Sequence, residues 1–169
     1  MKPKAFSAAA LCLAAWLVPA AHTAAQTAAA PKPGGTLKIA LRGDPGTLDC
    51  HAISSSHVAF VLFPAYSTLL KFDADKYPAI VGDLAQSWTV SPDGLQYTFK
   101  LQPGVKFHDG TAMTAQDVKA TYERLRSPPP GVVSLRQAQF EDIKSIDVVD
   151  AQTIRFRLGT RNSSMLTVF

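Results

Sequence analysis

The chain has 169 residues, of which 47% are hydrophobic and 18% charged, a composition that excludes an intrinsically disordered polypeptide. Its length suits one folded domain. The formal net charge of +4 falls to +2 when Lys2 and Lys4 are discounted as part of a leader, because the 17 basic residues become 15 against 13 acidic ones. So small a surplus, without a run of basic residues, argues against a nucleic-acid partner.

The first residues have the pattern of a secretion signal. Lys2 and Lys4 precede an uncharged apolar stretch, residues 8–21, which is short for a membrane span and suits a signal peptide. Small residues at 23–25 predict cleavage after Ala25, which places the mature protein in a bacterial periplasm. An uncleaved membrane anchor is the alternative. Residues 26–35 then form a flexible lead-in.

The cleaved chain would keep a single cysteine. Cys12 lies in the leader, so Cys50 remains alone and cannot form an internal disulfide. We expect its thiol to be buried and inert.

The next segment predicts one strand, one loop and one helix. Residues 36–42 alternate in polarity and predict the first strand, and residues 48–56 predict a loop. Residues 57–67 are apolar and predict a buried helix with Val58, Val61, Leu62 and Ala65 on one stripe. Pro64 should kink or end this helix. A short strand follows at residues 69–72.

Residues 78–126 predict a hairpin, two glycine turns and a capped helix. Polarity alternates on both sides of the turn at residues 91–94, and the expected buried face holds Trp88, Val90, Tyr97, Phe99 and Leu101. Tight turns are expected at residues 103–104 and 108–110. The helix begins at Thr114, whose hydroxyl can accept an amide hydrogen bond, and Asp117 completes a capping box.

Spacing defines the buried face of that helix and the elements that follow it. Its apolar residues are Val118, Tyr122 and Leu125, and the prolines at 128–130 end it. Residues 143–149 and 153–158 predict a second hairpin, in which Ile154, Phe156 and Leu158 face opposite to Arg155 and Arg157. A final helix, capped by Asn162 or Ser163, should run to Phe169.

Three phrases in this stretch carry a resemblance to a known family. They read D-L-A-Q-S-W-T-V-S-P-D-G-L-Q-Y-T-F-K-L, G-V-K-F-H-D-G and T-A-Q-D-V. In order and spacing they resemble the N-terminal part of family 5 of the extracellular solute-binding proteins, which serve peptide, dipeptide and nickel ABC transporters. The resemblance extends upstream over residues 34–49 and, more weakly, downstream to residue 169.

This resemblance implies a fold and an organisation. The fold class is α/β with mixed α+β sheets, periplasmic-binding-protein-like of class II, here as an incomplete first lobe with an appended subdomain. Residues 36–77 would begin lobe I, and residues 78–169 would form the subdomain with two hairpins and the capped helix. The family's chains are much longer, so we expect a truncated product or fragment that binds no peptide measurably alone.

The resemblance also implies a function without catalysis. The chain would be part of the periplasmic substrate-binding component of an ABC importer for di- or oligopeptides. Its partners would be a small peptide or similar solute and a membrane permease; we expect a monomer that needs no cofactor or metal.

Position along the chain indicates where solute would bind. Binding crevices in α/β folds lie at the carboxyl ends of strands, and in the resembling family the segment after the first strand lines the ligand cleft. By position, the candidate ligand-binding residues are Ile53, Ser54, Ser56, His57 and Val58. Residues 131–140 are a second candidate wall. Both segments could instead be ordinary surface loops. Cys50 stands where the family usually has proline, which could loosen the first one.

Three other interpretations remain open at this stage. A secreted hydrolase would use His108 and Asp109, although no nucleophile elbow accompanies them. Substitution of His108 by alanine would abolish turnover in that case and alter only stability otherwise. A metal site could combine Cys50, His51 and His57, which lack zinc-type spacing. The chain could also be a non-functional truncated remnant, prone to aggregation through exposed apolar surface.

Overall fold

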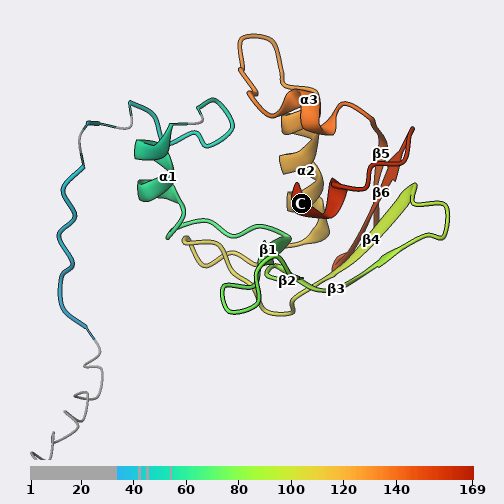
Figure 1. Ribbon diagram of the computed structural model, residues 1–169, viewed down its shortest axis with the longest axis horizontal. Coiled ribbons are helices and arrows are strands. Elements are labelled where there is room, and N and C mark those ends of the chain that lie inside the picture. Colours follow the sequence, from blue (N-terminus) through green and yellow to red (C-terminus); the bar gives the residue numbers. More distant parts are fainter. Residues whose placement is uncertain (1–33, 42, 45, 54) are drawn as a thin grey trace, which may run out of the picture. The chain divides into compact units, whose positions relative to one another are not determined.

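A computed structural model describes residues 34–169, except for residues 42, 45 and 54 (Figure 1). The predicted signal peptide and residues 26–33 lie outside the described part. The chain divides into two units, residues 1–38 and 39–169, and the second contains every helix and strand given below. Within the described part, no helix is both long enough and apolar enough to cross a membrane.

The second unit is built on a four-stranded antiparallel sheet. Its strands are β3 (Ala85–Val90), β4 (Gln96–Leu101), β5 (Ile143–Asp150) and β6 (Thr153–Leu158). They are ordered β3-β4-β6-β5, so two hairpins lie side by side and pair through their second strands. Both predicted hairpins are confirmed.

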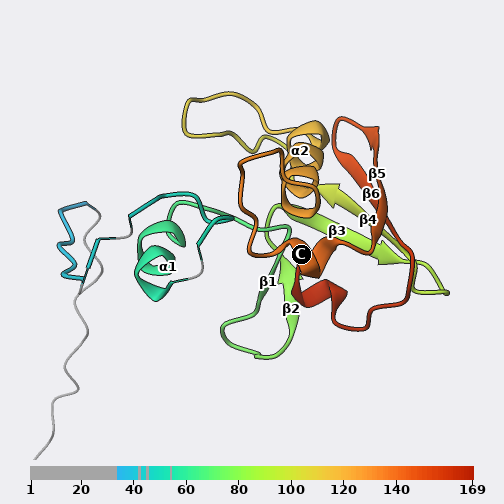
Figure 2. The same cartoon turned by 90° about the horizontal axis from the view of Figure 1, so that it is seen from above.

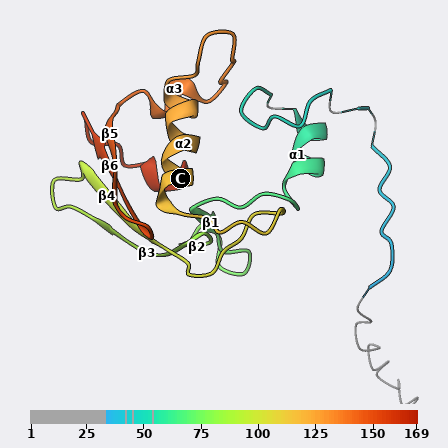
Figure 3. The same cartoon turned by 180° about the vertical axis from the view of Figure 1, so that it is seen from behind.

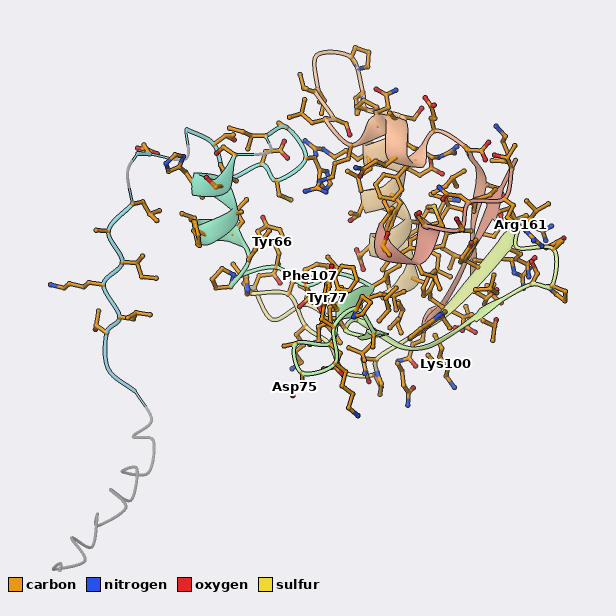
Figure 4. The ribbon with its side chains drawn as sticks, viewed as in Figure 1. Tyr66, Asp75, Tyr77, Lys100, Phe107 and Arg161 are labelled. Carbon is orange, nitrogen blue, oxygen red and sulfur yellow. The ribbon has the colours of Figure 1, made fainter. Side chains whose placement is uncertain are left out.

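The turn between β3 and β4 is closed by side chains. The Asp93 carboxylate accepts a hydrogen bond from the Leu95 amide at 3.0 Å and another from the Ser91 hydroxyl. Gly94 has a φ of +70°, which only glycine adopts readily. Arg161, labelled in Figure 4, donates to the carbonyls of Asp93 at 3.0 Å and Pro92 at 3.1 Å. The hairpin tip is thereby joined to the segment that follows β6.

Helix α2 (Ala115–Arg126) begins where the sequence predicts. The Asp117 carboxylate accepts hydrogen bonds from both the backbone amide and the hydroxyl of Thr114, each at 2.8 Å. The predicted capping box is therefore present, and the Thr114 hydroxyl, besides accepting from the backbone amide of Asp117, also donates to the carboxylate of Asp117. The helix ends at Arg126, and its C-cap, Ser127, directly precedes the three prolines.

The core lies between α2 and one face of the sheet, as Figures 1 and 3 show from opposite sides. Val118, Tyr122 and Leu125 are buried on the helix, as predicted. Tyr122 lies with its ring centroid 4.9 Å from that of Phe156 and 5.3 Å from that of Phe140. Edge-on aromatic pairs of this kind stabilise a core beyond the area that they bury.

The C-terminal segment is inserted into this core (Figure 2). Phe169 is 3% exposed, and its ring centroid lies 4.7 Å from that of Phe156. Its carbonyl accepts hydrogen bonds from the Leu69 amide and the Tyr122 hydroxyl, both at 3.1 Å. The predicted final helix is wrong: only a 3-10 turn forms, η1 (Met165–Thr167), because these contacts hold the end of the segment in the core.

The smaller elements differ most from expectation. The predicted short strand is confirmed as β1 (Leu70–Phe72), but its partner β2 (Ile80–Gly82) was not foreseen, nor was α3 (Gln137–Phe140). The predicted strand at residues 36–42 is wrong, since residues 36–41 have no regular structure and residue 42 is not described. Alternation alone does not make a strand, because its backbone groups also need a partner strand.

One face of β3 is also more exposed than predicted. Trp88 is only half-buried, and Val90 is 40% exposed, whereas Tyr97, Phe99 and Leu101 are buried as expected. β3 is the edge strand of the four-stranded sheet beside β4, and α2 packs instead against β5 and β6. Val90 therefore lies beyond the cover that the helix provides.

The difference in burial between the core and Val90 can be tested by measuring stability. Substitution of Phe156 by alanine should lower the free energy of unfolding by about 3–5 kcal/mol, because it removes a fully buried ring that packs against three other aromatic rings. Substitution of Val90 by alanine should change it by less than about 0.5 kcal/mol. Chemical denaturation of both variants tests this, and equal losses would contradict the assigned core.

Candidate functional site

The first candidate wall is a loop organised by Asp49. The Asp49 amide donates to the Thr47 hydroxyl at 3.1 Å, and the His51 amide donates to Asp49 Oδ1 at 2.9 Å. The Ala52 amide also bonds to the Asp49 carbonyl at 3.2 Å. Because these bonds span only two or three residues, they define a local turn that the rest of the loop follows.

This turn is attached to α2 by Arg124. Its guanidinium binds both carboxylate oxygens of Asp49, with NH2 2.6 Å from Oδ2 and NH1 3.3 Å from Oδ1. NH1 also lies 2.6 Å from Nδ1 of His51. Two-point contacts between a planar guanidinium and a carboxylate fix direction as well as distance.

The second candidate wall meets the first at the same place. The Leu135 amide donates to the His51 carbonyl at 2.9 Å, and the Ser134 hydroxyl donates to the Leu125 carbonyl at 2.8 Å. The segment before α3 is thus bonded both to the loop and to the end of α2. The structure brings the two predicted walls together at His51 and Leu135.

The charges at this junction shift two pKa values downward. The hydrogen bond from Arg124 holds the pKa of Asp49 below its ordinary value of 3.8. Desolvation by burial, together with the nearby Arg124 charge, lowers the pKa of His51 below 6.5. Asp49 is therefore charged and His51 neutral at neutral pH.

Helix α1 (Ser56–Leu62) begins directly after the loop. Ser55 is its N-cap, and its hydroxyl accepts from the Val58 amide at 3.4 Å. The helix is shorter than the predicted span, 57–67, and its C-cap is Phe63, so Pro64 marks its end as expected. Val61 and Ala65, predicted on the buried stripe, are exposed.

The candidate ligand-binding residues lie at this loop-to-helix junction. Ile53 and His57 are half-buried, Ser56 is exposed, and Val58 is buried, while Ser54 lies outside the described residues. Val58 is therefore on the buried side of α1, and the more accessible side chains are those of Ser56, Ile53 and His57.

Two surface depressions in the described part lie elsewhere. One, of about 40 Å³, is lined by residues of β1, Ile80 and the η1 turn. The other, of about 250 Å³, lies beside the β3–β4 turn and includes Asp93 and Arg157. Small-molecule sites usually enclose about 300–1,000 Å³, so neither has the size of such a site.

The other chemical candidates have structural roles or no supporting geometry. Asp109 accepts hydrogen bonds from the amide and hydroxyl of Thr111, at 2.9 and 2.7 Å, and so closes the turn on which His108 lies. This matches the expected turn and assigns the carboxylate a structural partner. Within the described residues, no group of three His, Cys, Asp or Glu is arranged to hold a metal ion.

Side-chain burial tests the expectations for the Cys50 thiol and for the aromatic residues. Cys50 is half-buried, so the expectation of a buried thiol is not met. The exposed aromatic side chains include Tyr66, Tyr77 and Phe107, labelled in Figure 4. Tyr97 and Phe99, by contrast, are buried in the core, as expected for the inner face of the hairpin.

Sequence reasoning missed the residues that join the walls. Asp49 and Arg124 are 75 positions apart, and neither lies in a pattern of spacing that pairs them. A signal was present only in part: Arg124 neighbours the buried stripe of an amphipathic helix, and Asp49 follows Thr47 in a turn-like sequence.

Comparison with known proteins assigns the chain to a family. The family model described as "Bacterial extracellular solute-binding proteins, family 5 Middle" matches residues 79–169, more than half of the chain. The fold is shared with periplasmic binding proteins of known structure. One is DppA from Helicobacter pylori in complex with the peptide STSA, with a TM-score of 0.63 and 29% identity over 72% of this chain and 26% of that one.

Curated relatives agree with this assignment. The chain is 35% identical over 151 residues to the glutathione-binding protein GsiB of Pectobacterium atrosepticum, which covers 89% of this chain and 29% of GsiB. It is 38% identical over 144 residues to the probable D,D-dipeptide-binding periplasmic protein DdpA of Escherichia coli, covering 83% and 26%. The chain belongs to family 5 of the bacterial extracellular solute-binding proteins and spans less than a third of these relatives' length.

The cap of α1 offers a direct test of the loop-to-helix junction. Replacing Ser55 by alanine removes the side chain that binds the Val58 amide, so hydrogen exchange at Val58 should accelerate by about two- to thirtyfold. Replacement by aspartate should preserve the protection. Ser67→Ala, at an exposed position outside the helix, is the matched control. Equal exchange in the alanine and aspartate variants would contradict the assigned cap.

Proposed function

We propose that this chain is part of the periplasmic substrate-binding component of an ABC importer for di- or oligopeptides, and that it binds solute without catalysing a reaction. The observation that carries this proposal is the family match over residues 79–169. It is supported by relatives named for glutathione, a tripeptide, and for D,D-dipeptides.

The proposal includes the organisation of the molecule. Residues 1–25 are a cleaved signal peptide and residues 26–35 a flexible lead-in. Residues 36–77 begin lobe I, and residues 78–169 form an appended subdomain. The protein acts as a monomer that takes up a small peptide in the periplasm and delivers it to a membrane permease.

The ligand loop, defined as residues 49–58, contributes one wall of the solute site in this proposal. Ile53 offers apolar contact, and Ser56 and His57 offer hydrogen-bonding groups that suit a peptide backbone. Val58 is on the buried side of α1, and Ser54 is the remaining residue of the proposed site. Affinity comes from burying the solute between this wall and a second lobe, which closes by a hinge motion.

The hydrolase alternative receives no comparable support. A general base needs a carboxylate or amide that orients its ring, and Asp109 instead bonds to Thr111 within the turn. Substitution of His108 by alanine should therefore leave solute binding unchanged.

A segment exchange tests peptide binding in a complete receptor. Residues 34–169 would replace the matching segment of Helicobacter pylori DppA, whose structure contains the peptide STSA. Calorimetry should show that the exchanged protein binds STSA, or another peptide of two to five residues, within about tenfold of the parent's affinity. A protein that melts cooperatively but binds no peptide in such a panel would refute the peptide assignment.

The same exchanged protein tests the ligand loop. Ile53→Ala and His57→Ala should each weaken peptide binding by about five- to thirtyfold, since each removes a contact of roughly 1–2 kcal/mol. Ser67→Ala and His108→Ala are controls that should leave binding within about twofold. Unchanged affinity in the first pair would remove these residues from the site while leaving the peptide assignment intact.

A further inference from the structure

The ligand loop is held to the rest of the second unit by one arginine side chain and one backbone amide. Arg124 contacts Asp49 and His51 on the loop, and the carbonyl of His51 in turn accepts the Leu135 amide. Arg124 lies in the last turn of α2, next to Leu125, which is buried in the core. A rigid helix therefore presents one guanidinium to a loop whose other hydrogen bonds, among its described residues, are local turn bonds and the bond from the Leu135 amide.

We propose that Arg124 is the positioning residue of the ligand loop, and that protonation of His51 releases the loop from α2 and from residue 135. This inference rests on the proposed function for its biological meaning, because the loop it positions is the proposed solute wall. Its geometry stands on the contacts given above.

The chemistry of the imidazole explains the release. Arginine only donates hydrogen bonds, so Nδ1 of His51, 2.6 Å from NH1, must accept and must carry no proton. The neutral ring then carries its proton on Nε2, where it is a donor. Protonation of Nδ1 would replace the acceptor with a second donor facing a cation, which breaks this bond and adds repulsion.

The charged groups around His51 act on its pKa in both directions. Arg124 on α2 and Arg136 before α3 both disfavour a charged His51, while Asp49 on the loop favours it. Cys50 also lies close enough to influence Arg124. Burial and the two cations prevail, so the pKa of His51 is lowered in the attached state.

The pH range in which the loop detaches follows from the lowered pKa of His51. The detached loop titrates near the ordinary value of 6.5, and the attached loop only at lower pH, so the detached state binds more protons between the two values. Attachment is therefore complete above about pH 7 and weakens as pH falls from 6.5 through the lower value. Protonation of Asp49, whose pKa lies below 3.8, weakens it further only in stronger acid.

Histidine NMR tests the contact without any solute. In the chain labelled with ¹⁵N, the ring of His51 should show the tautomer protonated at Nε2 and a pKa below the ordinary value of 6.5. In Arg124→Gln the pKa should rise, because a cation is lost and Asp49 is left unpaired. Arg124→Lys keeps the charge without the planar fork, so a low pKa should persist while the fixed tautomer is lost.

Hydrogen exchange at Leu135 reports attachment, since its amide bonds to the His51 carbonyl. Its protection factor should fall about fivefold or more between pH 7.5 and pH 5, and by a similar factor in Arg124→Gln at pH 7.5. In His51→Asn an amide oxygen replaces Nδ1 as acceptor but cannot titrate, so protection should persist and not depend on pH. Arg126→Gln, which removes the neighbouring pair with Glu123, is the control and should leave His51 unchanged.

The inference and the proposed function fail separately. A His51 ring that titrates identically in the wild type and Arg124→Gln would overturn the inference, as would an unaltered pH dependence of Leu135 protection in His51→Asn. Neither measurement uses a peptide. If both give the expected result and the exchanged DppA binds no peptide, the positioning role of Arg124 is supported and only the peptide assignment is refuted.

Discussion

The site depends on the fixed orientation of α2 about its own axis. Tyr122 contacts Phe140, Phe156 and Phe169 and donates its hydroxyl to the Phe169 carbonyl, so the helix can face the sheet in only one orientation. Its burial raises the pKa of the phenol, which stays neutral. With Tyr122 and Leu125 inward, Arg124 emerges at the flank, where it reaches the loop.

Hydrophobic and polar interactions therefore stabilise different parts of this structure. Buried aromatic and aliphatic side chains hold the four-stranded sheet, α2 and the C-terminal segment together, and none of the buried residues in the described part is polar or charged. The loop that begins at Asp49 is attached instead by half-exposed charged and polar groups. Such attachments are weaker than a core and respond to pH, so a wall held in this way can move while the scaffold stays fixed.

Local patterns in the sequence predict much of this fold. Alternation, the Ser91–Gly94 turn and the cap at Thr114 each involve neighbouring residues, and both hairpins and α2 form where they indicate. The misses involve distant partners: β2, the exposure of Val90 and the buried end at Phe169 all depend on what packs alongside. The candidate walls were placed by position, but their junction through Asp49 and Arg124 required the structure.

The place of Phe169 in the core has a consequence for synthesis on the ribosome. Its ring fills the space among Tyr97, Phe99, Tyr122 and Phe156, all of which leave the exit tunnel earlier. Until residue 169 is added, the nascent polypeptide has its hairpins and helix but not the ring that they enclose. Among the rings of this cluster, that of Phe169 is therefore the last to be synthesised, so the earlier aromatic side chains must wait for it before the interior can close.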